Sequence, residues 1–129
     1  MIPKFRAYDS SSYKRMYKPD EVMVGNGDIW IIDEDSCDNE WIVNNDIHLM
    51  QSTNLRDKNN EEIFEGDILD YNGRKVIVKW HGSFACFIYE FVDELKSRTA
   101  EWQPLYLSYY KFEIVGNSLE NPELLEVTE

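Results

Sequence analysis

The acidic run at residues 33–40 is the densest group of side chains that could do chemistry. Five of its eight residues are carboxylates, which are the ligands that hard cations such as Ca²⁺ take. An EF-hand loop also needs Gly at its sixth position and Glu at its twelfth. Counted from Asp33, those positions hold Asp38 and Asn44, and a second count from Asp57 fails as well. We therefore predict no specific metal site and expect a solvated loop.

Two further positions are candidates for acid–base chemistry. The step Glu65-Gly66-Asp67 places carboxylates beside a turn, where general acids and bases are common. In the structural alternative, Gly66 relaxes the backbone and Asp67 accepts hydrogen bonds from neighbouring amides as a strand begins. We favour the structural alternative, and we favour it for Asp57 and Asn59 too, as Asx-type turn residues.

Zinc and nucleophile chemistry have few candidate residues in this chain. There are two histidines, His48 and His81, and two cysteines, Cys37 and Cys86, which we interpret as free thiols. Their spacing matches no zinc motif, and the sequence contains neither a nucleophile elbow nor a glycine-rich phosphate loop. The sequence therefore predicts no catalytic residue, no metal site and no cofactor.

The charge of the chain is strongly negative and unevenly distributed. Against 25 Asp and Glu stand 13 Lys and Arg, for a net charge of −12, which disfavours nonspecific contacts with nucleic-acid phosphates. Residues 1–18 are basic, whereas residues 19–55 and 112–129 contain no Lys or Arg at all. The acidic stretch has three interpretations: a solvated surface, which we favour, a face that docks on a basic protein, and weak cation binding.

The aromatic residues allow two interpretations as well. They could form a base-stacking platform, but basic residues are not interleaved with them, so we favour packing in a core or an interface. The residues concerned are Trp30, Trp41, Trp80, Trp102, Tyr106, Tyr109 and Tyr110.

Composition and length indicate an ordinary folded domain. The chain has 129 residues, of which 43% are hydrophobic, enough to build a packed core, so disorder throughout is excluded. No uncharged stretch is long enough to span a membrane, and the first residues show no secretory signal. We expect the protein to act in the cytoplasm of the cell that makes it, without a membrane partner.

In the first part of the chain, we expect short strands joined by turns to position the candidate residues. The segments at 3–9 and 13–17 alternate as strands do. The turn Gly25-Asn26-Gly27-Asp28 and the turn Asn44-Asn45-Asp46 each separate two apolar segments, and each predicts a hairpin. We therefore interpret residues 1–55 as a β-meander.

Tight turns dominate the prediction for residues 56–129 as well. The pattern at residues 63–71 predicts one extended segment, and Asn72-Gly73 predicts a hairpin turn. The pattern at residues 74–80 predicts a strand with Val76, Val78 and Trp80 on one face. A turn at His81-Gly82 leads into a strand at 83–89. The remaining predictions are a helix at 90–98, strands at 105–109 and 112–116, and a helix that starts at Asn121-Pro122. This pattern suits a small SH3-like barrel.

Three segments carry a resemblance to a known family. They are KFRAYD at residues 4–9, LMQSTNLRDKNNEEIFEGDI at residues 49–68 and IVGNSLENPELL at residues 114–125. In this order they resemble the YopX family of phage and prophage proteins. The chain departs from the family pattern at Asn54 and Asn60, where Gly is usual. Asn accepts a left-handed backbone best among the other residues, so we expect both turns to persist. Ser52 and Leu119 replace residues that are often bulkier.

The resemblance implies a fold and leaves the activity open. It implies a mainly β fold, with a small SH3-like barrel, an additional β-meander and one or two short helices, in a single domain over residues 1–129. Oligomeric assembly is also expected. Our leading hypothesis is a non-catalytic phage accessory protein that acts by protein–protein interaction, as a homo-oligomer. The alternative is an acidic decoy that binds a host nucleic-acid-binding protein. An enzyme acting on small polar substrates, and a DNA-binding protein that uses the basic N-terminal strand, are weaker hypotheses.

Overall fold

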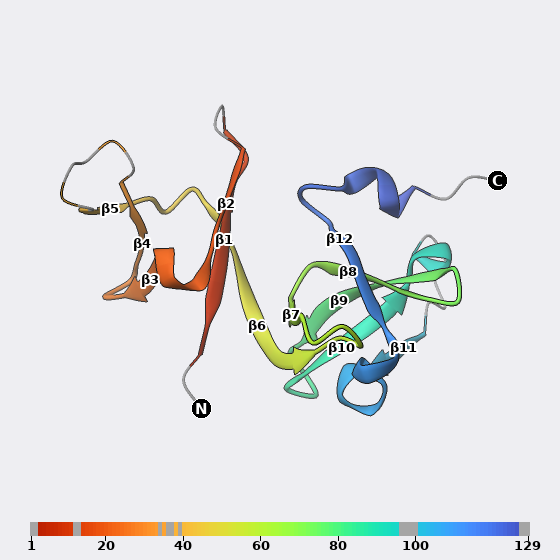
Figure 1. The fold of residues 1–129 in the computed structure, drawn as a ribbon. Helices are drawn as coiled ribbons and strands as arrows, with labels where there is room; N and C mark the ends of the chain where they lie inside the picture. The colour runs from red at the N-terminus through yellow and green to blue at the C-terminus, as the bar shows by residue number, and fades with distance from the viewer. Residues whose placement is uncertain are drawn as a thin grey trace. The chain divides into compact units, whose positions relative to one another are not determined.

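The chain folds into two compact units of antiparallel β-structure. The computed structural model describes residues 3–11, 14–33, 35, 38, 40–95 and 101–126. Its two units are Met1–Gln51 and Ser52–Glu129 (Figure 1). The fold is mainly β, as predicted, and its helices are short 3-10 turns. In the described part of the chain, no helix has the length and apolar character needed to cross a membrane.

The first unit consists of two small sheets around one core. One sheet has the order β2-β1-β6 and the other the order β3-β4-β5. Apolar side chains from both sheets meet in the core, which includes Ala7, Tyr17, Val22, Ile31 and Ile47. The elements are β1 (Phe5–Asp9), β2 (Arg15–Tyr17), η1 (Pro19–Glu21), β3 (Val22–Gly25), β4 (Asp28–Ile32), β5 (Trp41–Val43) and the first half of β6 (His48–Arg56).

One predicted hairpin of this unit forms and the other does not. Strands β3 and β4 pair around the turn Asn26-Gly27, where both residues have positive φ. Strands β5 and β6 also form, but β5 pairs with β4 and β6 pairs with β1, so the hairpin predicted through Asn44-Asn45-Asp46 is wrong. The reason is that this loop binds back to β4. The backbone N–H of Asn44 donates to the Ile29 carbonyl (2.8 Å), and the Asn45 side chain accepts from the Ile29 N–H (2.8 Å).

Strand β6 changes register in its second half. The pairs Ser52–Phe64 and Arg56–Glu62 place more residues on β6 than on β7 (Glu62–Phe64), so β6 bulges between them. Asn54 lies in this bulge with φ +62°, and Asn60 has φ +65° in the turn that follows. Both asparagines therefore adopt the left-handed backbone that was predicted for them. The Ser52 hydroxyl accepts a hydrogen bond from the Asn54 N–H (3.0 Å), which supports the bulge.

The second unit is a curled five-stranded sheet, which resembles half of a barrel. Its strand order is β11-β10-β9-β8-β12 (Figure 1). The strands are β8 (Asp67–Tyr71), β9 (Arg74–His81), β10 (Cys86–Phe91), β11 (Trp102–Pro104) and β12 (Glu113–Asn117), and the helical turns are η2 (Val92–Glu94), η3 (Leu105–Leu107), η4 (Tyr109–Lys111) and η5 (Pro122–Leu125). The core includes Ile63, Leu69, Val76, Val78, Tyr89, Leu105 and Phe112.

The central meander of this unit agrees with the sequence pattern. Strands β8 and β9 pair around Asn72-Gly73, and both turn residues have positive φ. Val76 and Val78 are fully buried, whereas Trp80, further along the same strand, is half exposed and packs edge-on against Phe87.

Two segments of the second unit are shorter or more broken than predicted. The extended segment predicted at 63–71 breaks at Gly66, which has φ +87°, so β7 and β8 are separate strands. The strand predicted at 83–89 begins only at Cys86, because residues 82–85 form a turn in which Ala85 has φ +50°.

Two segments of the second unit adopt another structure than predicted. The helix predicted at 90–98 is wrong at its start: Glu90 and Phe91 pair with β9, helical turn η2 covers only Val92–Glu94, and residues 96–100 lie outside the described part. The strand predicted at 105–109 is two 3-10 turns. Leu105 is fully buried there, while the next two residues are exposed. The burial of the Leu105 side chain therefore holds this segment in place, and it does so without strand pairing.

The last turn of the chain depends on Gly116. A Cβ atom built on Gly116 would lie 2.6 Å from Oδ1 of Asn121 and 2.9 Å from Cδ1 of Leu124. Both contacts are shorter than packed atoms allow, and the Asn121 oxygen also accepts a hydrogen bond from the Asn117 N–H (3.1 Å). Glycine at this position therefore lets η5 pack against β12.

We predict that Gly116→Ala destabilises the protein by about 1–3 kcal/mol, the usual cost of overpacking. Urea denaturation monitored by tryptophan fluorescence would measure it. Gly82→Ala is the matched control, because a Cβ at Gly82 meets nothing within 4 Å, and it should change stability by less than about 0.5 kcal/mol. Equal losses for the two variants would contradict the packing argument.

Candidate functional site

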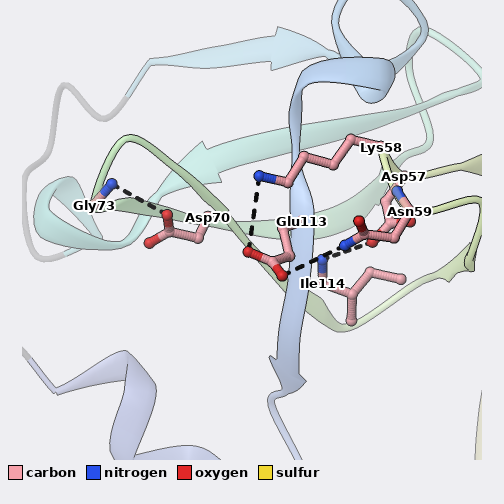
Figure 2. Close-up of polar contacts among 7 residues, drawn as sticks. All are labelled: Asp57, Lys58, Asn59, Asp70, Gly73, Glu113 and Ile114. Carbon is pink, nitrogen blue, oxygen red and sulfur yellow. Dashed lines mark hydrogen bonds and ion pairs between the residues drawn. The ribbon is translucent and has the colours of Figure 1, made fainter.

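Asp57 is a structural residue, as the sequence predicted. It is 6% exposed, and its Oδ1 accepts the backbone N–H groups of Asn59 and Glu61, each at 2.9 Å. Its Oδ2 accepts the N–H of Ile114 in β12, also at 2.9 Å (Figure 2). Three of the roughly four lone-pair sites of this carboxylate are therefore occupied by backbone amides. Asn59 completes the turn, and its side chain reaches Glu113.

The Glu65-Gly66-Asp67 step also has the structural role that we favoured. Asp67 is 1% exposed, and its Oδ2 accepts the backbone N–H of Phe64 at 2.7 Å. Gly66 donates its N–H to Val78 (2.9 Å), and its carbonyl accepts from Ser118 (2.9 Å). The tight turn therefore joins three strands, and Asp67 is buried beneath it. This burial leaves Asp67 out of reach of a dissolved substrate.

The other candidates from the sequence do not come together into a reactive site. His48 is exposed and lies 3.1 Å from the Ser10 hydroxyl in the first unit. His81 contacts the rings of Phe84 and Trp102 in the second unit. Cys86 is a free thiol, and Cys37 lies outside the described residues. Where the structure describes the chain, no group of three or more His, Cys, Asp or Glu is arranged to hold a metal ion.

One cavity of the second unit is lined by aromatic rings, and we call it the aromatic pocket. Its volume is about 470 Å³, within the usual range for small-molecule sites. The buried rings of Tyr89 and Phe112 lie 5.0 Å apart, while Tyr71 and Phe91 contact them at 6.3 and 5.9 Å. The pocket is lined by Tyr71, Asn72, Arg74, Tyr89, Phe91, Ser108, Lys111 and Phe112.

The polar side chains that line the aromatic pocket are three hydroxyls, one amide and two cations. The hydroxyls of Tyr89 and Ser108 lie 3.1 Å apart. The guanidinium of Arg74 lies over the Phe91 ring, 3.6 Å from its centroid. The hydrogen bonds that Arg74 donates to Asp93, helped by the charges of Asp93 and Glu94, raise the pKa of Arg74 above its usual value. Arg74 is therefore cationic at every accessible pH.

The side chains of the aromatic pocket offer stacking, hydrogen bonding and positive charge. Its eight lining residues include no Asp, Glu, His or Cys. The sequence analysis did not find this pocket, because its residues come from β8, β9, β10 and the turns at Leu105–Lys111. The aromatic residues that the sequence analysis assigned to packing are a different set, and none of them lines this pocket.

Two comparisons place the chain among known proteins. The model of the YopX protein family matches residues 4–126, which is nearly the whole chain. The chain belongs to the YopX family. It is also similar to a solved structure, that of protein EF1440 from Enterococcus faecalis, with 29% identity, a TM-score of 0.60, and coverage of 98% of this chain and 99% of that one. No curated protein matches it.

The segments that suggested the YopX family are those that build the turns of this fold. Asp57 and Asp67 lie in the central segment and accept backbone amides, as described above. In the last segment, the Asn117 side chain accepts the N–H groups of Leu119 and Glu120, at 3.1 and 2.8 Å. Asp57, Asp67 and Asn117, which all lie in these segments, therefore have roles in folding.

For this YopX-family protein, we predict that Asp57→Asn lowers the free energy of unfolding by about 2–3 kcal/mol. An amide has one oxygen, so at least one of the three buried N–H groups loses its acceptor. Urea denaturation would measure the change.

Asp70→Asn is the matched control for this prediction. Asp70 accepts only the Gly73 N–H, at the protein surface (3.1 Å, Figure 2). It should lose less than about 0.5 kcal/mol. A stable Asp57→Asn variant would show that the three amides do not need the carboxylate.

Proposed function

We propose that this protein is a non-catalytic accessory protein of a phage or prophage, which acts by protein–protein interaction and assembles with copies of itself. One observation carries the proposal: the carboxylates that were the best candidates for acid–base chemistry, Asp57 and Asp67, are buried and hold backbone amides. A turnover activity that disappears in Glu65→Gln or Asp67→Asn, while the fold persists, would overturn it.

Exposed apolar side chains on the second unit support an interaction role. Tyr106, Leu107 and Tyr110 lie on η3 and η4, and they are 58%, 60% and 57% exposed. Large apolar groups that remain exposed in adjacent turns are typical of surfaces that another protein covers. We call these three residues the η3–η4 surface.

A second candidate function is docking on a basic protein through the first unit. Met23, Trp30 and Val43 lie opposite one another across β3, β4 and β5 and form one apolar row. The other face of this sheet carries Val22 and Ile31 into the core. The surrounding residues 19–55 contain nine acids and no Lys or Arg. An apolar row within an acidic environment favours a partner that combines apolar and basic side chains.

Light scattering at low and high salt tests the leading proposal. We expect a mass that is a multiple of 15.3 kDa and that resists salt, because apolar contacts are not screened. Tyr106→Ser combined with Leu107→Ser should shift the mass toward the monomer. Val115→Ser, at another exposed apolar site of the same unit, should not. A monomer at every concentration would contradict self-assembly.

The docking alternative predicts binding of a synthetic peptide in which Lys or Arg alternates with Val. Binding should weaken steeply as salt rises, and the same peptide with Glu in place of the basic residues should not bind. Val43→Ser should weaken binding about tenfold, through the loss of apolar contact area.

Val24→Ser is the matched control for the peptide experiment. Val24 and Val43 are 48% and 45% exposed, on opposite faces of the same sheet. The Val24 variant should bind the basic peptide as the unchanged protein does. Isothermal titration calorimetry would compare the two variants, and equal losses would contradict docking on the row of Met23, Trp30 and Val43.

A further inference from the structure

The aromatic pocket has a floor and walls suited to a flat ring. Tyr89 and Phe112 are buried, at 8% and 5% exposed, and meet edge to face with an interplanar angle of 68°. Phe91 stands nearly perpendicular to Tyr89, at 88°. Tyr71 remains 47% exposed although it contacts Phe112. A half-exposed ring beside two buried ones leaves an aromatic surface on which a planar ligand can stack.

Polar groups inside the pocket allow a ligand to be oriented. The Tyr89 and Ser108 hydroxyls share one hydrogen bond at 3.1 Å. Each hydroxyl can donate one and accept two hydrogen bonds, so the pair retains further capacity toward a ligand. A small-molecule site is usually a mainly apolar cavity that contains a few polar groups.

Both charged residues that line the pocket are cations, although the chain as a whole is acidic. Arg74 donates two hydrogen bonds to Asp93, both at 3.1 Å, and one to Glu94 at 3.2 Å, so its planar guanidinium is fixed over Phe91 and its charge is matched by two carboxylates. Lys111 is exposed, and among the described residues the structure gives it no carboxylate partner. None of the eight lining residues is acidic, although 25 of the 129 residues in the chain are. Lys111 is therefore the charge at the rim that remains available to an anion.

We propose that the aromatic pocket binds a small, planar aromatic molecule that carries a carboxylate or another anionic group. The ring stacks on Tyr71 above Tyr89 and Phe112, and the anion lies near Lys111. The site borders the η3–η4 surface, because Nζ of Lys111 lies 5.8 Å from the centroid of the Tyr110 ring. The proposal goes beyond the proposed function, because it concerns a small ligand in a pocket and not a protein partner on an exposed surface.

Indole-3-acetate is a suitable probe, because it combines a planar ring with one carboxylate. We would titrate it into isotopically labelled full-length protein and follow the amide signals by NMR. A ligand of this size should bind with Kd of about 1 mM or tighter. The shifted signals should include Asn72, Tyr89 and Ser108. Tryptamine has the same ring with a cation, and it should bind at least tenfold more weakly.

Three variants separate the charge from the stacking. Lys111→Gln should weaken binding of indole-3-acetate about tenfold, in line with the loss of one charged contact. Tyr71→Ala should weaken it by a similar factor through the loss of stacking. Lys79→Gln removes an equal charge from the same sheet, where Lys79 pairs with Glu90 outside the pocket, and should leave the affinity unchanged.

Three outcomes would overturn the proposal. Equal binding of tryptamine and indole-3-acetate would exclude anion selectivity. Equal effects of the Lys111 and Lys79 variants would show that only the net charge matters. Tighter binding of the peptide Ala-Ala-Ala-Trp, with its free carboxylate, than of indole-3-acetate would assign the pocket to the C-terminus of a partner protein instead.

Discussion

The second unit depends on one buried carboxylate. Asp57 accepts two amides of its own turn and one from Ile114, which is 57 residues further along the chain. Next to it, the Lys58 N–H donates to the Phe112 carbonyl at 2.9 Å. These contacts fix the place where β12 begins, and β12 then pairs with β8 along the sheet edge. Because Phe112 forms part of the floor of the aromatic pocket, the pocket exists only while this junction holds.

The distribution of polar groups distinguishes binding from catalysis in this protein. A buried carboxylate is stable when backbone amides or cations satisfy it, and Asp57 and Asp67 are satisfied by amides. In contrast, the aromatic pocket has no acid and two cations, and the η3–η4 surface has apolar groups without cover. The chemistry available at the surface is therefore recognition by stacking, apolar contact and charge. These surface groups are the physical basis of the interaction role that we propose.

The sequence predicted local turns well and partners of strands less well. Asn72-Gly73, Asn54 and Asn60 adopt positive φ because their preference is set by their own backbone. The error at β5 and β6 has a different origin. Asn44 and Asn45 could have closed a hairpin, but they bind Ile29 of β4, and β6 finds a partner in β1 instead. The residues of a turn alone therefore do not determine which of several strands will pair with the strand that follows the turn.

The sequence by itself therefore determined the β-rich class, most of the tight turns and the family. Each of these depends on residue types within a few positions, where backbone preference and side-chain hydrogen bonds act. The tertiary structure alone decided that residues 105–109 form 3-10 turns around buried Leu105, and that Tyr71, Tyr89, Phe91 and Phe112 surround one cavity. Those outcomes depend on long-range packing, in which the burial of one side chain outweighs the pattern of its neighbours.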